Sequence, residues 1–560
     1  MKKIPYGISD FKRLKIEDYF FVDKTDYIEK IESESSSYLM FLRPRRFGKS
    51  LLIAILEAYY DTYFKDEFEA IFKDTYILNN RTKEASSYMV LGFDFSAVDI
   101  FDVNESFKHL LQLKIESFVQ RYNLDIKFTL DNPIAMLNNV FDYTKKHHLN
   151  LYILIDEYDN FANRLFLNSR DDYLNIVTQK TAPFKQFFTT LKAGTAGNNA
   201  PIKRMFITGV TPMTMYDVTS GFNIGKNISL DSRFHNMIGL NSNEVDNALR
   251  DFEITDKVDK RLLEEWYNHY IFSEETTEPI YNTDMILYFI DEFIIHHKLP
   301  REMIDINIRS DYSKLRSIIY TNKKLNGNFK SLQTLIGGGS IPIANLVQDF
   351  SALNLHKEDN FKSFMFYLGL VSIKDRDLDL NLYIPNETVK RIDIDFLANS
   401  LEVERVFEIN VSRLQEHLKA FALRGELKVF EYLATKIKEN TGIRDYIYNE
   451  QTVKSMYLSY LSLSPYYVIK SENELNKGFS DILLKPLNPY VKYVGLVEFK
   501  YIKRTKNLPS QKKIDALVAE ATKQLDEYAE DELVKNYIRD GLKLQKVVIV
   551  FCGWEMVYIA

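Results

Sequence analysis

A short basic segment, residues 43–50 (RPRRFGKS), lies between an apolar run at 37–42 that is typical of a buried strand and a helix-like run at 51–60. A loop that opens a helix points its backbone N–H groups at an anion, and the helix dipole favours negative charge there. In such a loop Lys49 would reach the β and γ phosphates of a nucleotide, and the Ser50 hydroxyl would ligate Mg²⁺. The segment departs from the G-x-x-x-x-G-K-[ST] pattern at Arg43, where glycine is expected. The candidate phosphate-binding residues are Arg46, Gly48, Lys49 and Ser50.

Two acids follow a strongly apolar, strand-like run. Leu151–Ile155 leads directly into Asp156 and Glu157. Burying acids at a strand end is costly unless they take part in a site, and in nucleotide hydrolases this position holds a Mg²⁺-associated Asp and a water-activating Glu. The alternative is a strand end capped by solvated acids. Thr208 ends another strand-like run and is either a polar sensor near the γ-phosphate or the start of a turn. Arg233 is either a charge-stabilising finger or a solvated surface arginine.

A second set of acids lies near the C-terminal end. Glu498 and Lys500 end a strand-like run at 493–499, and strand alternation puts them on one face. Asp481 begins the preceding strand-like run. Two carboxylates from neighbouring strands can hold Mg²⁺, and with a lysine they can position a water for attack on a phosphodiester. Glu-x-Lys alone is common and often forms a surface salt pair, so the prediction depends on the combination with Asp481.

Other residues around this set fit the same interpretation. Glu450 opens a helix-like run and could add a metal ligand, or it could simply favour the first helical turn. Gln524 and Tyr528, four residues apart, share a face of a later helix that looks toward either the site or the core. A basic stretch suits a polyanionic substrate or a solvated loop; its members are Lys492, Lys500, Lys503, Arg504, Lys506, Lys512 and Lys513.

Composition limits the class of protein. With 72 Lys and Arg against 78 Asp and Glu, the net charge of the 560 residues is −6, which excludes bulk nucleic-acid binding but leaves local basic sites possible. The one cysteine, Cys552, excludes intramolecular disulfides and cysteine-based zinc sites and suits a reducing compartment. No apolar run approaches the roughly 20 residues of a spanning helix. We therefore expect a cytoplasmic protein without membrane association.

The order of strand-like and helix-like runs predicts an α/β fold. In residues 1–240 the two alternate, which favours a parallel sheet covered on both faces. Residues 241–410 are mainly helical, and Gly337–Gly339 is interpreted as a turn or hinge because no GK[ST] follows it. Residues 411–560 follow the order helix, three strands, helix, strand, with one long helix expected at 414–438. We predict three domains with these boundaries.

Both halves resemble known families. Residues 1–240 resemble an AAA-ATPase-like domain through Pro5–Phe11 (PYGISDF), Asp23–Thr25 (DKT), the RPRRFGKS loop, Leu151–Asp159 (LYILIDEYD) and Phe206–Val210. In that family arginine is usual at the first loop position. The C-terminal part resembles the PD-(D/E)XK nuclease superfamily, with Asp481 as its first acid, Glu498 and Lys500 as its E-x-K, and Gln524 and Tyr528 as its trailing helix motif. The usual Gly-Arg-x-Asp is Gly478-Phe479-Ser480-Asp481 here.

The leading hypothesis is an ATP-dependent or ATP-regulated nuclease, that is, an ATP-binding and ATP-hydrolysing protein coupled to a Mg²⁺-dependent nuclease domain that acts on nucleic acid. ATP and Mg²⁺ are the expected cofactors, with Ser50, Asp156, Asp481 and Glu498 as metal ligands and Glu157, Asp481, Glu498 and Lys500 as catalytic residues. Nucleic acid is the expected partner, with DNA favoured over RNA, and the resemblance allows a homo-oligomer. The alternatives are a non-catalytic, ATP-dependent switch or binding protein with a degenerate nuclease domain, and an interaction protein whose motifs are relics.

Overall fold

The computed structural model divides into two compact units. Residues 1–314 and 342–388 form the first unit, and residues 315–341 and 389–560 form the second. The structure describes residues 2–99, 101–128, 132–168, 170–179, 181–218, 224–300, 302–305, 320–321, 324–325, 327–394, 409–440, 447, 449–475, 478–487, 490–505 and 509–560. Lys477, which precedes the Gly478–Asp481 segment, and Lys506 of the basic stretch lie outside this set.

A five-stranded parallel sheet forms the centre of the first unit. Its order is β2-β3-β4-β1-β5. The strands are β1 (Tyr38–Leu42), β2 (Met89–Asp94), β3 (Leu151–Asp156), β4 (Ile202–Gly209) and β5 (Lys226–Asn227). Every residue of β3 is buried, as expected for a central strand with helices on both faces. The predicted parallel α/β sheet is confirmed.

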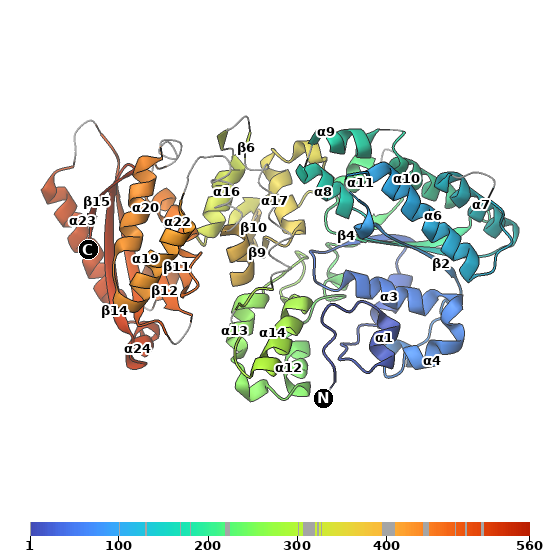
Figure 1. The fold of residues 1–560 in the computed structure, drawn as a ribbon, viewed down its shortest axis with the longest axis horizontal. Coiled ribbons are helices and arrows are strands. Elements are labelled where there is room, and N and C mark those ends of the chain that lie inside the picture. Colours follow the sequence, from blue (N-terminus) through green and yellow to red (C-terminus); the bar gives the residue numbers. More distant parts are fainter. Residues whose placement is uncertain are drawn as a thin grey trace. The chain divides into compact units, whose positions relative to one another are not determined.

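Helices cover both faces of this sheet. Figure 1 shows α3 (Lys49–Tyr60) on one face and α6 (Val103–Arg121), α7 (Pro133–Lys146) and α10 (Pro183–Gly194) on the other. Phenylalanines, including Phe93 of β2 and Phe187 of α10, fill the layer between the sheet and the second group. Shorter helices complete this part: α1 (Phe11–Ile16), α2 (Tyr27–Glu32), α4 (Phe68–Ile71), α5 (Tyr76–Asn79), α8 (Asn160–Asn168), α9 (Arg170–Tyr173) and α11 (Met213–Val218).

A mainly helical part follows, as the sequence predicts. It contains α12 (Ser242–Asp251), α13 (Lys260–Tyr267), α14 (Thr283–His296) and α17 (Glu358–Tyr367). A small sheet of order β8-β10-β9 accompanies α17 and comprises β8 (Ile341–Ile343), β9 (Ser372–Arg376) and β10 (Leu380–Tyr383). Among the described residues, none of the helices has the length and apolar character needed to cross a bilayer.

The second unit is built on a mixed five-stranded sheet of order β11-β12-β13-β14-β15, in which β13 and β14 are parallel and the other pairs antiparallel. Its strands are β11 (Tyr467–Leu475), β12 (Gly478–Pro486), β13 (Tyr493–Ile502), β14 (Lys543–Cys552) and β15 (Glu555–Ile559). Its helices are α16 (Gly327–Ile336), α19 (Val411–Arg424), α20 (Lys428–Glu439), α22 (Glu450–Leu461), α23 (Gln511–Ala529) and α24 (Glu532–Arg539). Figure 1 shows the strands between α23 on one face and α19, α20 and α22 on the other.

One predicted element of this unit is wrong. The single helix expected at 414–438 is two helices, α19 and α20. Gly425 follows α19 with φ +70°, a left-handed conformation that glycine adopts without the Cβ clash of other residues, and it ends the helix there. The 3.6-residue hydrophobic period continues through the break, which is why the pattern alone predicts one helix.

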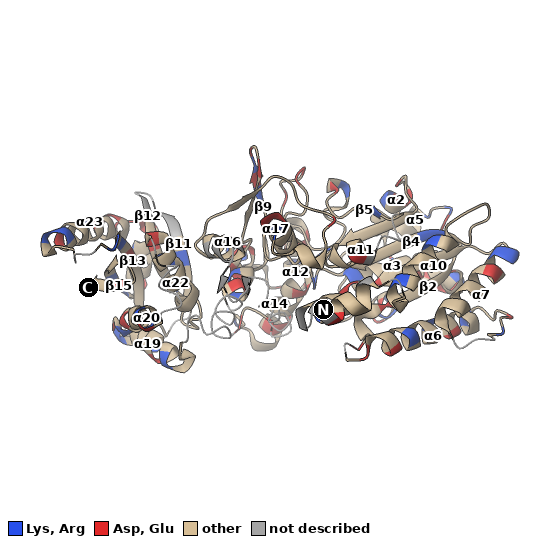
Figure 2. Cartoon of the chain, turned by 90° about the horizontal axis from the view of Figure 1, so that it is seen from above, with Lys and Arg blue, Asp and Glu red and all other residues tan. Residues whose placement is uncertain are grey.

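Charges of both signs are interspersed. Figure 2 shows basic and acidic residues next to one another along α6 and α23. The near-neutral balance of the chain is therefore reproduced locally on these helices, and the sites below depend on individual buried charges.

Candidate functional site

The loop before α3 has the backbone of an anion-binding turn. Arg46 has φ +69° and Gly48 has φ +107°, and α3 begins at Lys49. Gly48 caps the helix without a side-chain hydrogen bond, so the first N–H groups of α3 have no partner from a cap side chain. Left-handed residues next to a helix N-terminus make a concave set of N–H donors. The loop that the sequence predicts is present.

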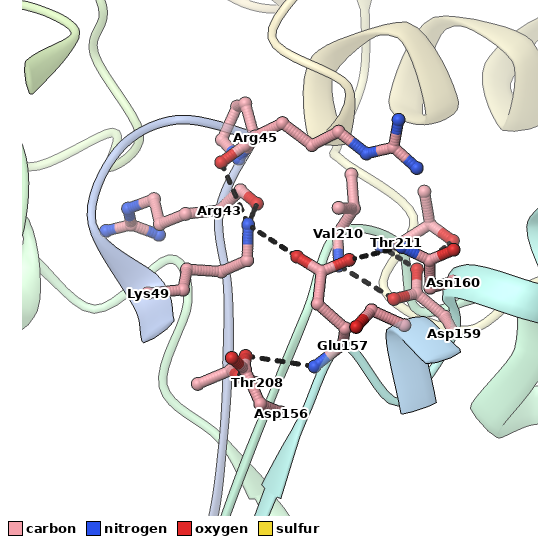
Figure 3. Close-up of polar contacts among 12 residues, drawn as sticks. Arg43, Arg45, Lys49, Asp156, Glu157, Asp159, Asn160, Thr208, Val210 and Thr211 are labelled. Atoms are coloured by element: carbon pink, nitrogen blue, oxygen red, sulfur yellow. Dashed lines mark hydrogen bonds and ion pairs between the residues drawn. The ribbon is translucent and has the colours of Figure 1, made fainter. Parts of the chain in front are cut away.

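Lys49 is buried beneath this loop and held by several oxygens. Only 4% of its surface is exposed. Its ammonium group donates to the carbonyl oxygens of Arg43 and Pro44, both at 3.1 Å, and lies 3.6 Å from Glu157 Oε1. Figure 3 shows Lys49 and Glu157 pointing toward one another. Without a ligand, the charge of Lys49 is therefore shared between the loop carbonyls and one carboxylate.

Asp156 ends β3 beside Thr208 of β4. The Thr208 hydroxyl donates to Asp156 Oδ1 at 2.5 Å, and the Glu157 N–H donates to the same oxygen at 3.0 Å. Burial raises the pKa of Asp156 above its ordinary value, while hydrogen bonds from Ser50 and Thr208 oppose that rise. The structure thus brings together Ser50, Asp156 and Thr208, three residues that sequence reasoning named separately.

Glu157 has a second partner that sequence reasoning missed. Asn160, the first residue of α8, donates from Nδ2 to Glu157 Oε2 at 2.9 Å. Burial alone would raise the pKa of Glu157, but Lys49 and Asn160 more than offset it, and the pKa is lowered. Glu157 also has φ +51°, an uncommon conformation for glutamate. The three-residue spacing of Asn160 from Glu157 does not predict this contact, because the conformation of the turn decides where the Asn160 side chain points.

The turn that carries these acids is anchored to β4. Asp159 is fully buried and accepts the backbone N–H groups of Val210 at 3.0 Å and Thr211 at 2.7 Å (Figure 3). A Cβ at Gly209 would lie 2.4 Å from the Tyr158 ring and 2.6 Å from Asp159 Oδ1. Only glycine permits this close approach.

Arg43 lies beneath the loop. Its guanidinium group donates to the carbonyl oxygens of Leu42 at 3.0 Å and Ser229 at 2.5 Å, and it stacks between the rings of Phe41 and Phe272. Burial lowers its pKa. Arg43 therefore supports the loop from the core instead of taking the place of a phosphate-contacting glycine. The other arginine considered, Arg233, is exposed and pairs with Asp231 and Glu34.

A cavity of about 620 Å³ opens in front of the loop. Its polar end is lined by cationic side chains, namely Lys24, Arg45, Arg46, Lys49 and Arg164. Its apolar wall comes from other segments and includes Phe20, Ile28, Leu52, Ile55, Met237 and Leu240. Arg46 Nη1 lies 3.4 Å from Asp284, whose pKa burial raises to about 6. The lining of the cavity combines cationic side chains, which attract anions, with apolar ones.

The second site lies in the C-terminal sheet. Ile482 of β12 pairs with Val497 of β13, and this register brings Asp481 next to Glu498. Asp481 Oδ2 accepts the Phe499 N–H at 2.8 Å, and the Lys500 ammonium lies 3.2 Å from Glu498 Oε1. Asp481 lies inside β12, three residues after its first residue, and not at the start of the strand as predicted. The two acids and the lysine are brought together.

Glu498 has an unusual environment. It is 4% exposed, and its Oε2 atom has no hydrogen-bond partner among the described residues. Burial raises its pKa to about 7; the neighbouring Asp481 charge adds to the rise and Lys500 opposes it. Glu450 also has a raised pKa, caused by burial and then by Asp481. Within the described ranges no three His, Cys, Asp or Glu side chains form a metal-binding cluster.

Two helices complete the surroundings. On α22, Lys454 lies 3.2 Å from Asp481 Oδ1, a contact that sequence reasoning missed. On α23, Tyr528 belongs to the hydrophobic core of the unit, and burial together with the charges of Glu498 and Asp481 raises its pKa. Gln524 Oε1 is buried and has no partner among the described residues. In the basic stretch, Arg504 pairs with Glu555.

Comparison with known families agrees with both halves of this description. The model of the family described as predicted AAA-ATPase matches residues 5–219. The model of the PD-(D/E)XK nuclease superfamily matches residues 448–560. The chain carries an AAA-ATPase-like domain and a PD-(D/E)XK superfamily domain. Both resemblances drawn from the sequence are confirmed.

Individual relatives are more distant. An uncharacterized protein in the vnfD 5′ region of Azotobacter chroococcum mcd 1 is 25% identical over 295 residues, covering 51% of this chain and 52% of that protein. The chain thus spans about half the length of that curated relative. The Aeropyrum pernix ORC2 protein (ADPNP-ADP complexes) has 12% identity and a TM-score of 0.31, covering 68% of this chain and 92% of its own. Cdc6p from Pyrobaculum aerophilum has 10% identity and a TM-score of 0.23, covering 72% and 96%. Neither structural likeness bears on function.

Proposed function

We propose that this protein binds and hydrolyses ATP in its AAA-ATPase-like domain and cuts nucleic acid in its PD-(D/E)XK domain. The observation that carries the proposal is that each unit buries a lysine against a carboxylate beside a second acid. Buried charges of this kind are expensive to maintain for stability alone, because removing them from water costs several kcal/mol per ion. Clusters of this kind are typical of functional sites.

The nucleotide proposal rests on the cavity and the loop together. A volume of about 620 Å³ is within the usual size of small-molecule sites. The phosphates would lie against the loop N–H groups and Lys49, with Arg46 and Gly48 shaping the turn, and the base would lie toward the apolar wall. Ser50 and Asp156 fit Mg²⁺, because their hydroxyl and carboxylate oxygens are ligands that this ion accepts.

Hydrolysis would depend on Glu157 leaving Lys49. Lys49 and Glu157 lie 3.6 Å apart and neutralise one another. A terminal phosphate that binds Lys49 competes with Glu157 for that ammonium, so Glu157 can turn to orient a water, with Asn160 still holding its other oxygen. Thr208, bonded to Asp156, would keep that carboxylate in place. Mg²⁺ would supply charge neutralisation at the phosphates.

The nuclease proposal rests on Asp481, Glu498 and Lys500. Glu498 Oε2, which has no hydrogen-bond partner in the described part of the chain, and the neighbouring Asp481 fit a hard divalent cation that takes carboxylate oxygens. Bound there, Mg²⁺ would supply Lewis-acid polarisation of the phosphodiester. Lys500 would orient the attacking water or the phosphate. We favour DNA over RNA as the substrate. We also propose that the protein acts in the cytoplasm, where Cys552 stays reduced, and that it forms a homo-oligomer.

A second candidate function is a non-catalytic nucleotide switch. The Lys49–Glu157 contact favours it, because a carboxylate committed to the loop lysine is not available to a water. In that case ATP binding would change the protein without turnover, and the C-terminal domain would bind nucleic acid without cutting it.

The test is a pair of assays on the full chain. ATP turnover should be measured for the wild type and Glu157→Ala, and cleavage of DNA and RNA in Mg²⁺ or Mn²⁺ for the wild type, Asp481→Ala and Glu498→Ala. We expect each activity to be lost in its own variants. ATP binding without turnover in the wild type would favour the switch, and cleavage that persists in both acid variants would exclude the nuclease site.

A further inference from the structure

Lys454 of α22 reaches into the nuclease-like site from outside its sheet. The residue is 3% exposed, and its ammonium lies 3.2 Å from Asp481 Oδ1. Glu450 lies one helical turn earlier on α22, and its raised pKa responds to Asp481, Lys500 and Lys454. Residues four apart share a helix face. Both α22 side chains therefore belong to the charged cluster of the site.

The four carboxylate oxygens of Asp481 and Glu498 are not equally available. Asp481 Oδ2 accepts the Phe499 N–H, and Glu498 Oε1 lies 3.2 Å from Lys500. Asp481 Oδ1 is held by Lys454, and Glu498 Oε2 has no partner among the described residues. A cation that uses both acids can approach Glu498 Oε2 directly. At Asp481 Oδ1 it meets an ammonium group already in contact.

The charge balance of the cluster agrees with this competition. Among the described residues, the carboxylates of Glu450, Asp481, Glu498 and Glu520 face the ammonium groups of Lys454 and Lys500, so the acids outnumber the lysines. A divalent cation placed between the acids would repel the neighbouring ammonium group electrostatically. Lys454 would then be driven from Asp481.

We propose that Lys454 is a positioning residue that occupies Asp481 Oδ1 until a divalent cation takes that oxygen, and that the displaced ammonium then contacts the phosphodiester. This inference rests on the nuclease function proposed above. A purely structural lysine at this place would stabilise the fold, because removing one partner of a buried ion pair leaves the other charge uncompensated, and its removal would not be expected to strengthen metal binding. A competing lysine predicts something different: removing it strengthens metal binding while weakening cleavage.

The experiment is calorimetric titration of Mn²⁺, without nucleotide, into the full-length wild type and Lys454→Gln. We expect Lys454→Gln to bind Mn²⁺ about tenfold more tightly, equal to 1.4 kcal/mol, and to cut DNA at least about tenfold more slowly. Lys454→Arg, which keeps the charge, should return the affinity toward that of the wild type. Lys428→Gln removes an exposed lysine of α20 that pairs with Glu426, and it should change neither Mn²⁺ affinity nor cleavage rate. Unchanged or weaker Mn²⁺ binding by a folded Lys454→Gln overturns the inference.

A measurement on the wild type covers the case in which the variant does not fold. Acylation of Lys454 by an amine-reactive reagent, followed by mass spectrometry, should increase severalfold on Mn²⁺ addition, because the ammonium moves away from Asp481. No increase overturns the inference. Asp481→Asn and Glu498→Gln distinguish failure of this inference from failure of the proposed metal site. If both variants lose Mn²⁺ binding while Lys454 labelling in the wild type is insensitive to Mn²⁺, only the role of Lys454 fails. If both bind Mn²⁺ as the wild type does, the metal site fails and the inference with it.

Discussion

The protein has two acid–lysine centres, Lys49 with Glu157 in the first unit and Lys500 with Glu498 in the second. They differ in which charge is left unbalanced. At the loop, the ammonium of Lys49 has two carbonyl oxygens besides Glu157, and the pKa of Glu157 is lowered. In the C-terminal sheet, Glu498 shares its surroundings with Asp481, and its pKa is raised to about 7. The first centre is satisfied without a ligand, so an anion has to compete for its lysine. The second has an excess of carboxylate, so it attracts a cation.

This difference explains why similar residue types suit different ligands. A cationic cavity in front of a helix N-terminus adds positive charge around Lys49. Near Glu498, the acids Asp481 and Glu450 add negative charge. We therefore propose phosphate recognition at the first centre and metal recognition at the second.

The largest expected effect is at Lys49. Lys49→Ala removes the buried ammonium that would meet the phosphates, and we expect Mg·ATP affinity to fall by roughly 100-fold, about 2.7 kcal/mol. Calorimetric titration of Mg·ATP measures it. Lys145→Ala on the exposed face of α7 is the control and should bind as the wild type does. Mn²⁺ binding at the second site should not change, because Lys49 is not among the residues that would hold that ion.

A smaller effect is expected at Gly209. In Gly209→Ala the new methyl group would lie 2.4 Å from the Tyr158 ring, and we expect the first unit to lose about 2 kcal/mol of unfolding free energy. Gly92→Ala on β2 is the matched control, since its Cβ would have no atom within 4 Å. Thermal unfolding curves of both variants measure the difference. Equal midpoints would mean that the acid-bearing turn is not anchored to β4 in this way.

The raised pKa of Glu498 predicts a pH dependence of metal binding. Below pH 7 the carboxyl holds its proton, and a proton competes with the cation, so Mn²⁺ affinity should rise about tenfold from pH 6 to pH 8. The free energy of unfolding of the metal-free second unit should instead fall as the pH rises. Between the ordinary glutamate pKa and about 7 the folded state holds the proton that the unfolded state releases, so stability falls as pH rises through that window.

Glu498→Gln should abolish both trends, as measured by titration calorimetry and denaturant unfolding at several pH values. The first centre provides the contrast, because the pKa of Glu157 is lowered and Glu157 stays ionised throughout this range. A pH profile that survives unchanged in Glu498→Gln would assign the titration to another group.

The smallest effect is expected at Asn160. Asn160→Ala removes the amide that holds Glu157 Oε2, and we expect kcat for ATP to fall about fivefold with unchanged Mg·ATP affinity, since one hydrogen bond contributes about 1 kcal/mol. Steady-state kinetics and calorimetry separate the two quantities. Gln112→Ala, which breaks a similar amide–carboxylate bond to Glu116 on α6, should leave both unchanged.

Much of the fold could be predicted from local pattern. The buried strands β1, β3 and β4 are short apolar runs, and the loop residues Gly48-Lys49-Ser50 mark where α3 begins. The same holds for β13, where alternation puts Glu498 and Lys500 on one face. The sequence does not predict the hairpin strand β15, which is short and only partly buried along its whole length, or the helix α24, which is amphipathic but has only eight residues.

The contacts that decide the chemistry could not be predicted. The Lys49–Glu157 and Lys454–Asp481 pairs join residues far apart in the chain, so spacing carries no information about them. Arg43 stands where the phosphate-loop pattern expects glycine, and the sequence does not predict that its side chain turns into the core, where it lies against Phe41 and Phe272. In each case the deciding quantity is the burial of a charge, which depends on packing and not on local sequence.

A cleavage time course on linear DNA tests the central claim most directly. Wild type, Lys49→Ala and Glu498→Gln would be compared in Mg²⁺ with and without ATP. The account predicts that the wild type cuts, that Lys49→Ala cuts at a rate that ATP no longer changes, and that Glu498→Gln does not cut in either condition. Cleavage by Glu498→Gln at the wild-type rate would contradict it.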